Sequence, residues 1–108
     1  MIHEILQRGS AGALTADEIS RFMNMSIREV TRQIERERRT GNPICASVTT
    51  PHGYYLADNA EELLHYVRRL RHRERELRKT RRALTRLFTR LYGEKTELQE
   101  ENAREREE

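Results

Sequence analysis

The apolar positions at the start of the chain recur at helical spacing. They are Ile2, Ile5 and Leu6, and residues 9–12, which include two glycines, follow them. Apolar residues three and four apart lie on one face of a helix, and a glycine-containing stretch of this kind ends it. We therefore expect a first short helix here.

Two capping-box patterns follow within fifteen residues. In each, a hydroxyl residue precedes a Glu by three positions, so that the hydroxyl and the carboxylate each bond a free backbone N–H at the start of a helix. Thr15 pairs with Glu18 in the first box, and Ser26 pairs with Glu29 in the second. Asn24 tolerates a left-handed backbone and supplies the turn between them. The first of these helices is expected to bury Ile19, Phe22 and Met23. Two capped helices joined by so short a turn predict a helix-turn-helix.

The helix that begins after Ser26 has two distinct faces. Met25, Val30 and Ile34 form its inner stripe, and Ile27 lies at the edge of that stripe. The outer face is strongly polar and is made by Arg28, Thr31, Arg32, Glu35, Arg36 and Arg39. Residues 41–43, Gly-Asn-Pro, are typical of the end of a helix.

Two short β-prone runs, residues 44–48 and 53–56, flank the turn at 49–52 and predict a hairpin. We expect Cys45 to be a small core residue, and Tyr54 and Tyr55 to point to opposite sides of their strand. The predicted fold is mainly α with a small β-hairpin. Three helices followed by a two-stranded wing define a winged helix-turn-helix domain, here residues 1–58.

Residues 59–108 form a second region, predicted to be one long helix with a coiled-coil-like repeat. Asp58 and Asn59 provide an N-cap signal, and no proline follows. Leucines recur every seven residues, at Leu63, Leu70, Leu77, Leu84, Leu91 and Leu98. The other seam positions are half polar and comprise Ala60, Val67, Glu74, Arg81, Phe88, Lys95 and Asn102. This pattern predicts a weak coiled coil.

The apolar residues of the long helix are expected to serve two purposes. Those near its start complete the core of the first domain: Leu63, Leu64, Val67 and Leu70. Those beyond about residue 72 bury little in a lone charged helix and call for a partner. We predict a homodimer in which the dimerisation residues are Leu77, Leu84, Leu87, Phe88 and Leu91.

Charge is distributed in blocks along the 108 residues, although the net charge is only +3. Residues 68–82 carry nine Arg or Lys and two Glu, a net +7, and the acidic tail 93–108 has a net −4. Charged residues make up 36% of the chain and apolar residues 35%, which indicates a helix solvated over most of its surface. No segment is apolar enough to be transmembrane or a signal peptide, so we expect a cytoplasmic protein without membrane contact.

The sequence contains no pattern typical of catalysis or metal binding. The single cysteine, Cys45, excludes an internal disulfide and a cysteine-based metal site. The four histidines lack a spacing that brings two of them together on one helix face. No nucleophile with its base, P-loop or dinucleotide fingerprint is present. We expect no enzymatic activity, no cofactor and no metal.

The stretch from Leu14 to Ala57 resembles the winged-helix domains of DeoR-like and biotin-repressor-like bacterial regulators. The matching features are LTADEIS, M-S-x-x-x-V-x-x-x-I, GNPI and GYYLA. Small phage and mobile-element proteins of Gram-positive bacteria are similar as well, including a helix that begins EELLHYVRRL. Asn24 stands where these proteins usually have Gly. No effector-binding domain follows the wing, so no small-molecule effector is expected.

The predicted function is sequence-specific binding of double-stranded DNA, which requires cations at phosphates and a helix in the major groove. Arg28 and Arg32, one turn apart, are the candidates for guanine edges. The remaining candidates are expected to contact phosphates, a thymine methyl or the minor groove: Thr15, Ser26, Thr31, Arg36, Thr50 and His52.

Two other functions fit parts of the pattern. An adaptor or structural protein of a phage replication or packaging machine would use the winged domain and the long helix for protein contacts. A toxin or inhibitor partner would bind RNA through the basic block at 68–82, although Glu and Thr alternate with its arginines. For the outer arginines of the third helix, the alternative to DNA contact is a solvated face with local ion pairs to the interleaved glutamates.

Overall fold

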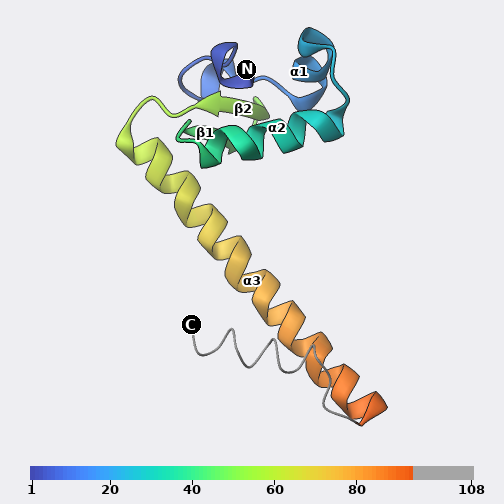
Figure 1. Ribbon diagram of the computed structural model, residues 1–108. Helices are drawn as coiled ribbons and strands as arrows, with labels where there is room; N and C mark the ends of the chain where they lie inside the picture. Colours follow the sequence, from blue (N-terminus) through green and yellow to red (C-terminus); the bar gives the residue numbers. More distant parts are fainter. Residues whose placement is uncertain (94–108) are drawn as a thin grey trace. The chain divides into compact units, whose positions relative to one another are not determined.

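The structure, a computed structural model, describes residues 1–93 and is mainly helical with one small antiparallel hairpin (Figure 1). Two 3-10 turns, Ile2–Glu4 and Ser10–Gly12, precede α1 (Ala16–Met23) and α2 (Ile27–Arg39). Strands β1 (Ile44–Ser47) and β2 (Gly53–Leu56) follow, and then α3 (Ala60–Tyr92). The chain divides into two compact units, Met1–Arg68 and Arg69–Glu108, and this division falls within α3.

The prediction of a first helix is wrong, because only the 3-10 turn Ile2–Glu4 forms there. The backbone that follows this turn pairs with β2 instead. The Leu56 N–H donates to the Gln7 carbonyl and the Gly9 N–H donates to the Leu56 carbonyl, both at 2.9 Å. These bonds hold the segment extended, so that Ile2 and Leu6 reach the core without an α-helix.

The two predicted caps place α1 and α2 as expected. Thr15 and Glu18 form both hydrogen bonds of a capping box. In the second box, the Ser26 side chain accepts a hydrogen bond from the Glu29 N–H at 3.1 Å, which is one of the two bonds of that motif. Asn24 ends α1 with a φ of 55°, the left-handed conformation predicted for it. The three-residue connection to α2 is further closed by the Ser20 hydroxyl, which donates to the Met25 carbonyl.

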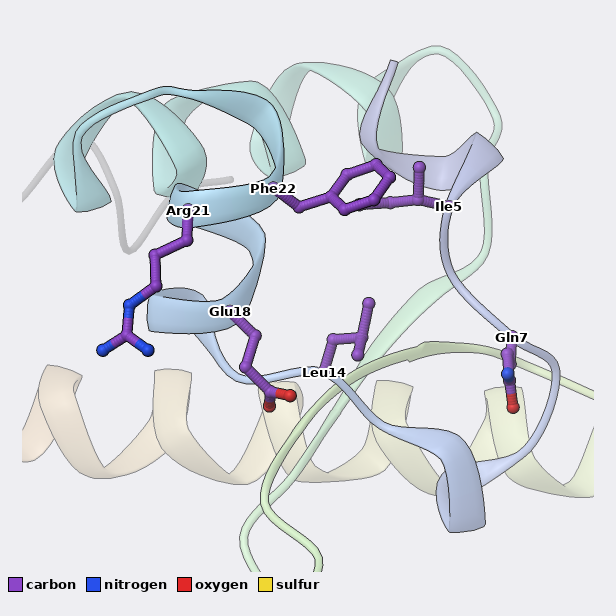
Figure 2. Close-up of a pocket in the computed structure, with 6 residues that line it drawn as sticks. All are labelled: Ile5, Gln7, Leu14, Glu18, Arg21 and Phe22. Atoms are coloured by element: carbon purple, nitrogen blue, oxygen red, sulfur yellow. The ribbon is translucent and has the colours of Figure 1, made fainter.

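Phe22 differs from its predicted position in the core. Ile19 is fully buried and Met23 is half-buried, but Phe22 is 73% exposed. Figure 2 shows its ring beside Ile5, at the edge of an open pocket. The N-terminal segment runs along this side of α1 as an extended chain, which covers less of α1 than a helix would.

Strand β2 lies between β1 and the chain that precedes α1. It pairs antiparallel with β1 in the register Ile44↔Leu56 to Ser47↔Gly53. On its other edge, Tyr54 exchanges two backbone hydrogen bonds with Leu14, of 3.0 and 2.7 Å. Gly53 has a φ of +136°, and a Cβ at that position would lie 2.3 Å from the Leu14 carbonyl oxygen. Only glycine permits this close approach, which fastens the hairpin to the start of α1.

The core consists of two neighbouring clusters of buried side chains. The first comprises Ile2, Leu6, Ile19, Val30, Ile34 and Ile44, and it contains the two buried residues of the predicted inner stripe of α2. The second comprises Cys45, Tyr55 and Tyr66. Cys45 is therefore a core residue as predicted, and Tyr55 is buried while Tyr54 is half-buried.

The residue by which α3 joins this core is Tyr66. The prediction that leucines and a valine complete the core is wrong, because all four are exposed: Leu63, Leu64, Val67 and Leu70. The Tyr66 ring packs in the second cluster and lies 5.0 Å from the guanidinium carbon of Arg38. A straight helix can pack only one narrow face against a small surface. In α3, the residue on that face is Tyr66, which packs against Cys45 and Tyr55.

A buried carboxylate anchors the N-terminus to α2. Glu37 is 1% exposed and accepts from the Ile2 N–H at 2.9 Å, the His3 N–H at 2.7 Å and the Gln33 amide at 2.8 Å. The His3 ring Nδ1 lies 2.6 Å from the same carboxylate. Burial by itself raises the pKa of Glu37, but these hydrogen bonds outweigh it and hold that pKa below its ordinary value. The anchor is therefore a charged group.

Candidate nucleic-acid interface

Helix α2 is held on one face and open on the other. Val30, Ile34 and Glu37 are buried on the inner face. The opposite face carries exposed residues at intervals of three and four, which lie close together on a helix surface: Arg28, Thr31, Arg32, Arg36 and Arg39. The buried face fixes the rotation of α2 about its axis, and therefore the direction in which the exposed cations point.

Arg28 and Arg32 are cations of this face without an internal partner, and Arg39 is a third. Within residues 1–93, no hydrogen bond or ion pair engages any of these three guanidinium groups. No interleaved glutamate forms an ion pair with Arg28 or Arg32 within the described residues. Glu37 is buried on the far side of the helix, and Glu35 pairs with Arg38 at 2.7 Å. The alternative of a face neutralised by local ion pairs therefore does not describe Arg28 and Arg32.

The other predicted contacts on α2 make local bonds and remain exposed. The Thr31 hydroxyl donates to the Ile27 carbonyl at 3.1 Å, which leaves its methyl group on the surface. Arg36 donates to the Gln33 side-chain oxygen at 3.2 and 2.9 Å. Ser26 caps the helix with its oxygen, and its hydroxyl hydrogen is still available to a phosphate at the helix N-terminus.

Thr15 is less suited to phosphate than predicted. Its backbone N–H already donates to the Glu18 carboxylate at 3.0 Å, and its hydroxyl accepts from the Glu18 N–H at 3.1 Å. Hydrogen bonds from the Thr15 backbone and side chain lower the pKa of Glu18, so this carboxylate is charged at neutral pH. A phosphate at the start of α1 would face that negative charge, and we leave Thr15 out of the proposed interface.

Thr50 and His52 lie in the connection between β1 and β2, and both are exposed. The segment before them is held by the Ser47 hydroxyl, which donates to the Thr49 carbonyl at 2.9 Å. Val48, predicted to belong to the first strand, lies just beyond it and is exposed as well. The loop thus offers small polar groups and the His52 ring, but no Arg or Lys.

Arg38 has a structural role that the sequence analysis missed. Its Nε donates to the Ile44 carbonyl at 2.9 Å, and its guanidinium carbon lies 5.9 Å from the Tyr54 ring centroid and 5.0 Å from that of Tyr66. It links α2 to both strands and to the start of α3. The one available signal was its position four residues after Ile34, at the edge of the inner stripe.

An open pocket of about 580 Å³ lies between the N-terminal segment and α1 (Figure 2). Ile5, Leu14 and Phe22 supply its apolar walls, and Gln7, Glu18 and Arg21 complete its lining.

In the described part of the chain, no group of three or more His, Cys, Asp or Glu side chains is placed to hold a metal ion. None of the helices described is long and apolar enough to cross a membrane.

The predicted dimerisation residues lie in the second half of α3. Leu77, Leu84, Leu87 and Leu91 are exposed, and Phe88 is half-buried with its ring centroid 5.1 Å from that of Tyr92. Leu98 and the acidic tail beyond Gly93 lie outside the described residues.

Comparisons with family models, curated proteins and solved structures gave no match to this chain.

Proposed function

We propose that this protein binds double-stranded DNA in a sequence-specific manner through a winged helix-turn-helix, as a phage or bacterial transcription regulator that dimerises through α3. The observation that carries the proposal is the pair Arg28 and Arg32, exposed and unpaired within residues 1–93 on a helix whose other face is buried. Guanidinium groups in this position can form bidentate hydrogen bonds with the O6 and N7 atoms of guanine.

The surroundings of α2 support a major-groove reader. Its short connection from α1 matches the helix-turn-helix arrangement, and the hairpin follows directly in the position of a wing. Ser26 at the helix N-terminus and Arg36 further along would position the backbone, while Thr50 and His52 would contact flanking phosphates or the minor groove. Sequence would then be read by Arg28 and Arg32, with Thr31 against a thymine methyl.

The first experiment is selection of a preferred duplex from a random pool, followed by fluorescence-anisotropy titration on that duplex. Arg28→Ala and Arg32→Ala should each weaken binding by about 1–3 kcal/mol, because each removes one bidentate base contact. Their thermal stability should be unchanged, since both side chains are exposed. Arg8→Ala is the matched control: it removes the same charge from another exposed position and should cost less than about 0.5 kcal/mol.

Salt dependence provides a second measurement on the same complex. With about four phosphate contacts, affinity should fall about a hundredfold between roughly 50 and 200 mM salt. A folded protein that selects no duplex, or Arg28 and Arg32 variants that bind like the parent, would contradict the proposal.

The pocket beside Phe22 favours one second candidate, the protein-docking adaptor. An aromatic side chain that is 73% exposed beside a pocket with apolar walls and a polar, charged rim is typical of a contact surface for another protein. This function would use Phe22 rather than Arg28 and Arg32. A folded chain that shows no DNA binding even at about 50 mM salt would favour it over DNA recognition.

A further inference from the structure

Helix α3 carries a regular stripe of leucines that nothing in the described chain covers. Leu77 is 68% exposed, and Leu84 and Leu91 are each 60% exposed. They belong to a strict seven-residue series, and such a series brings its members along one side of a helix, where they can meet an identical series on another helix. The stripe is self-complementary, which makes a second copy of this chain its natural partner.

The charge on the sequence selects the orientation of the two copies. In a parallel, in-register pair, the +7 block at 68–82 would lie against its own copy along its whole length. Reversing one copy about the segment Leu84–Leu91 places the two basic blocks at opposite ends of the pair, which removes this repulsion.

We infer that two copies of this chain pair antiparallel through α3, with Leu84 of each copy opposite Leu91 of the other and Leu87 and Phe88 at the centre. At 1.5 Å per residue, α3 then separates the two Arg68 residues by about 60 Å along the helix axis. Half-sites one helical turn apart are only about 34 Å apart. If the proposed DNA binding holds, the dimer joins two separated duplex sites rather than one compact palindrome.

Oligomeric state gives the first test, and it uses the full chain without DNA, so it does not depend on the proposed DNA binding. Sedimentation should show a dimer for the wild type and a monomer for the double variant Leu84→Gln, Leu91→Gln. Leu64→Gln is the matched control, an exposed leucine of α3 outside the seven-residue series, and should remain dimeric. All of these side chains are exposed, so circular dichroism should show folded proteins. A monomeric wild type at about 100 μM overturns the inference.

Disulfide crosslinking tests the orientation. Leu87→Cys lies at the centre of the antiparallel pair and should crosslink to its own copy there, which makes it the reference for efficient crosslinking. Leu77→Cys should not crosslink to itself, because the two copies of this position lie far apart in the antiparallel pair. Leu84→Cys should crosslink to Leu91→Cys when the two variants are mixed. The native Cys45 is fully buried, and the oxidised wild type gives the background. Self-crosslinking of Leu77→Cys as efficient as that of Leu87→Cys overturns the antiparallel pairing.

The effect of salt on dimerisation distinguishes the two orientations independently. In the antiparallel pair the two basic blocks lie apart, so raising NaCl from about 0.1 to 1 M, which shortens the screening length from about 10 to 3 Å, should leave the dimer affinity nearly unchanged. In the parallel pair like charges face each other, and the same screening would strengthen it. A dimer that tightens with salt therefore overturns the inference.

Discussion

Helix α2 and the part of α3 beyond Arg68 are both rich in arginine, yet they place their arginines in different physical settings. In α2, the buried residues Val30, Ile34 and Glu37 leave one face for the cations. In α3, residues 71–80 are exposed on every side. The arginines of α2 therefore have a fixed direction set by the core, whereas those at 71–80 surround the helix.

The carboxylates of the two helices differ as well. In α2, Glu35 pairs locally with Arg38, but Glu37 is buried and accepts hydrogen bonds from the backbone N–H groups of Ile2 and His3, which lie 35 and 34 positions earlier in the chain. In α3, Arg78 pairs with Glu74 at 3.9 Å and Lys79 with Glu76 at 3.1 Å, both within one helical turn and in solvent. Exposed pairs of this kind add little stability. Arginine content alone thus does not identify a binding face; the packing of the opposite side does.

The largest effect should come from a charge placed on the buried face of α2. Ile34→Asp puts an unpaired carboxylate in the first core cluster and should cost about 4 kcal/mol or more, enough to unfold a small unit. Leu77→Asp makes the equivalent change on the exposed surface of α3 and should leave the N-terminal unit folded. Thermal melts and limited proteolysis of both variants measure the contrast. A well-folded Ile34→Asp protein would show that the inner face of α2 is misassigned.

A smaller loss of stability is expected from a change at Tyr66, the residue of α3 that packs in the second core cluster. Tyr66→Ala removes a ring that fills the second cluster and stacks on Arg38, and should cost about 3 kcal/mol. Leu64→Ala, two positions earlier on the same helix, should cost less than about 1 kcal/mol because Leu64 is 47% exposed and belongs to neither core cluster. Chemical denaturation measures both values, and equal losses would place the contact face of α3 elsewhere.

The third prediction concerns the pH dependence of the Glu37 anchor. The pKa of Glu37 is lowered in the folded protein, so its contribution is fully present above the ordinary carboxyl range and is lost as pH falls through the lowered pKa. Glu37→Gln keeps one acceptor oxygen of two and should cost about 2 kcal/mol at pH 7. The gap between wild type and Glu37→Gln should therefore narrow as pH falls below about 4.

Glu76→Gln is the matched control for that measurement. A hydrogen bond from Lys79 lowers the pKa of Glu76 as well, but this carboxylate is in solvent. Its replacement should leave the unfolding free energy unchanged at every pH. Denaturant melts between about pH 3 and 7 test both variants, and a Glu37→Gln protein with the wild-type pH profile would show that the anchor adds no charge-dependent stability.

The candidate site could be predicted to a large extent, because the signals that place it are local. The hydroxyl residues Thr15 and Ser26 start α1 and α2, Asn24 makes the left-handed turn, and the helical period puts Val30 and Ile34 opposite Arg28 and Arg32. Which cations lack partners was not predictable. The glutamates of α2 occupy positions from which either outcome is possible, and their pairing depends on what packs beside them.

The sequence by itself determined the elements whose causes lie within a few residues: the helix caps, the turn at Asn24, the hairpin and the unbroken helix from Ala60. The tertiary structure alone decided which side chains meet across the fold. Glu37 receives the N-terminus, Tyr66 and not its leucine neighbours joins the core, and Phe22 stays in solvent beside an extended segment. The physical reason is the separation along the chain of the groups that interact. A helix cap is satisfied by residues of its own helix, whereas burial depends on the shape of surfaces contributed by distant parts of the chain.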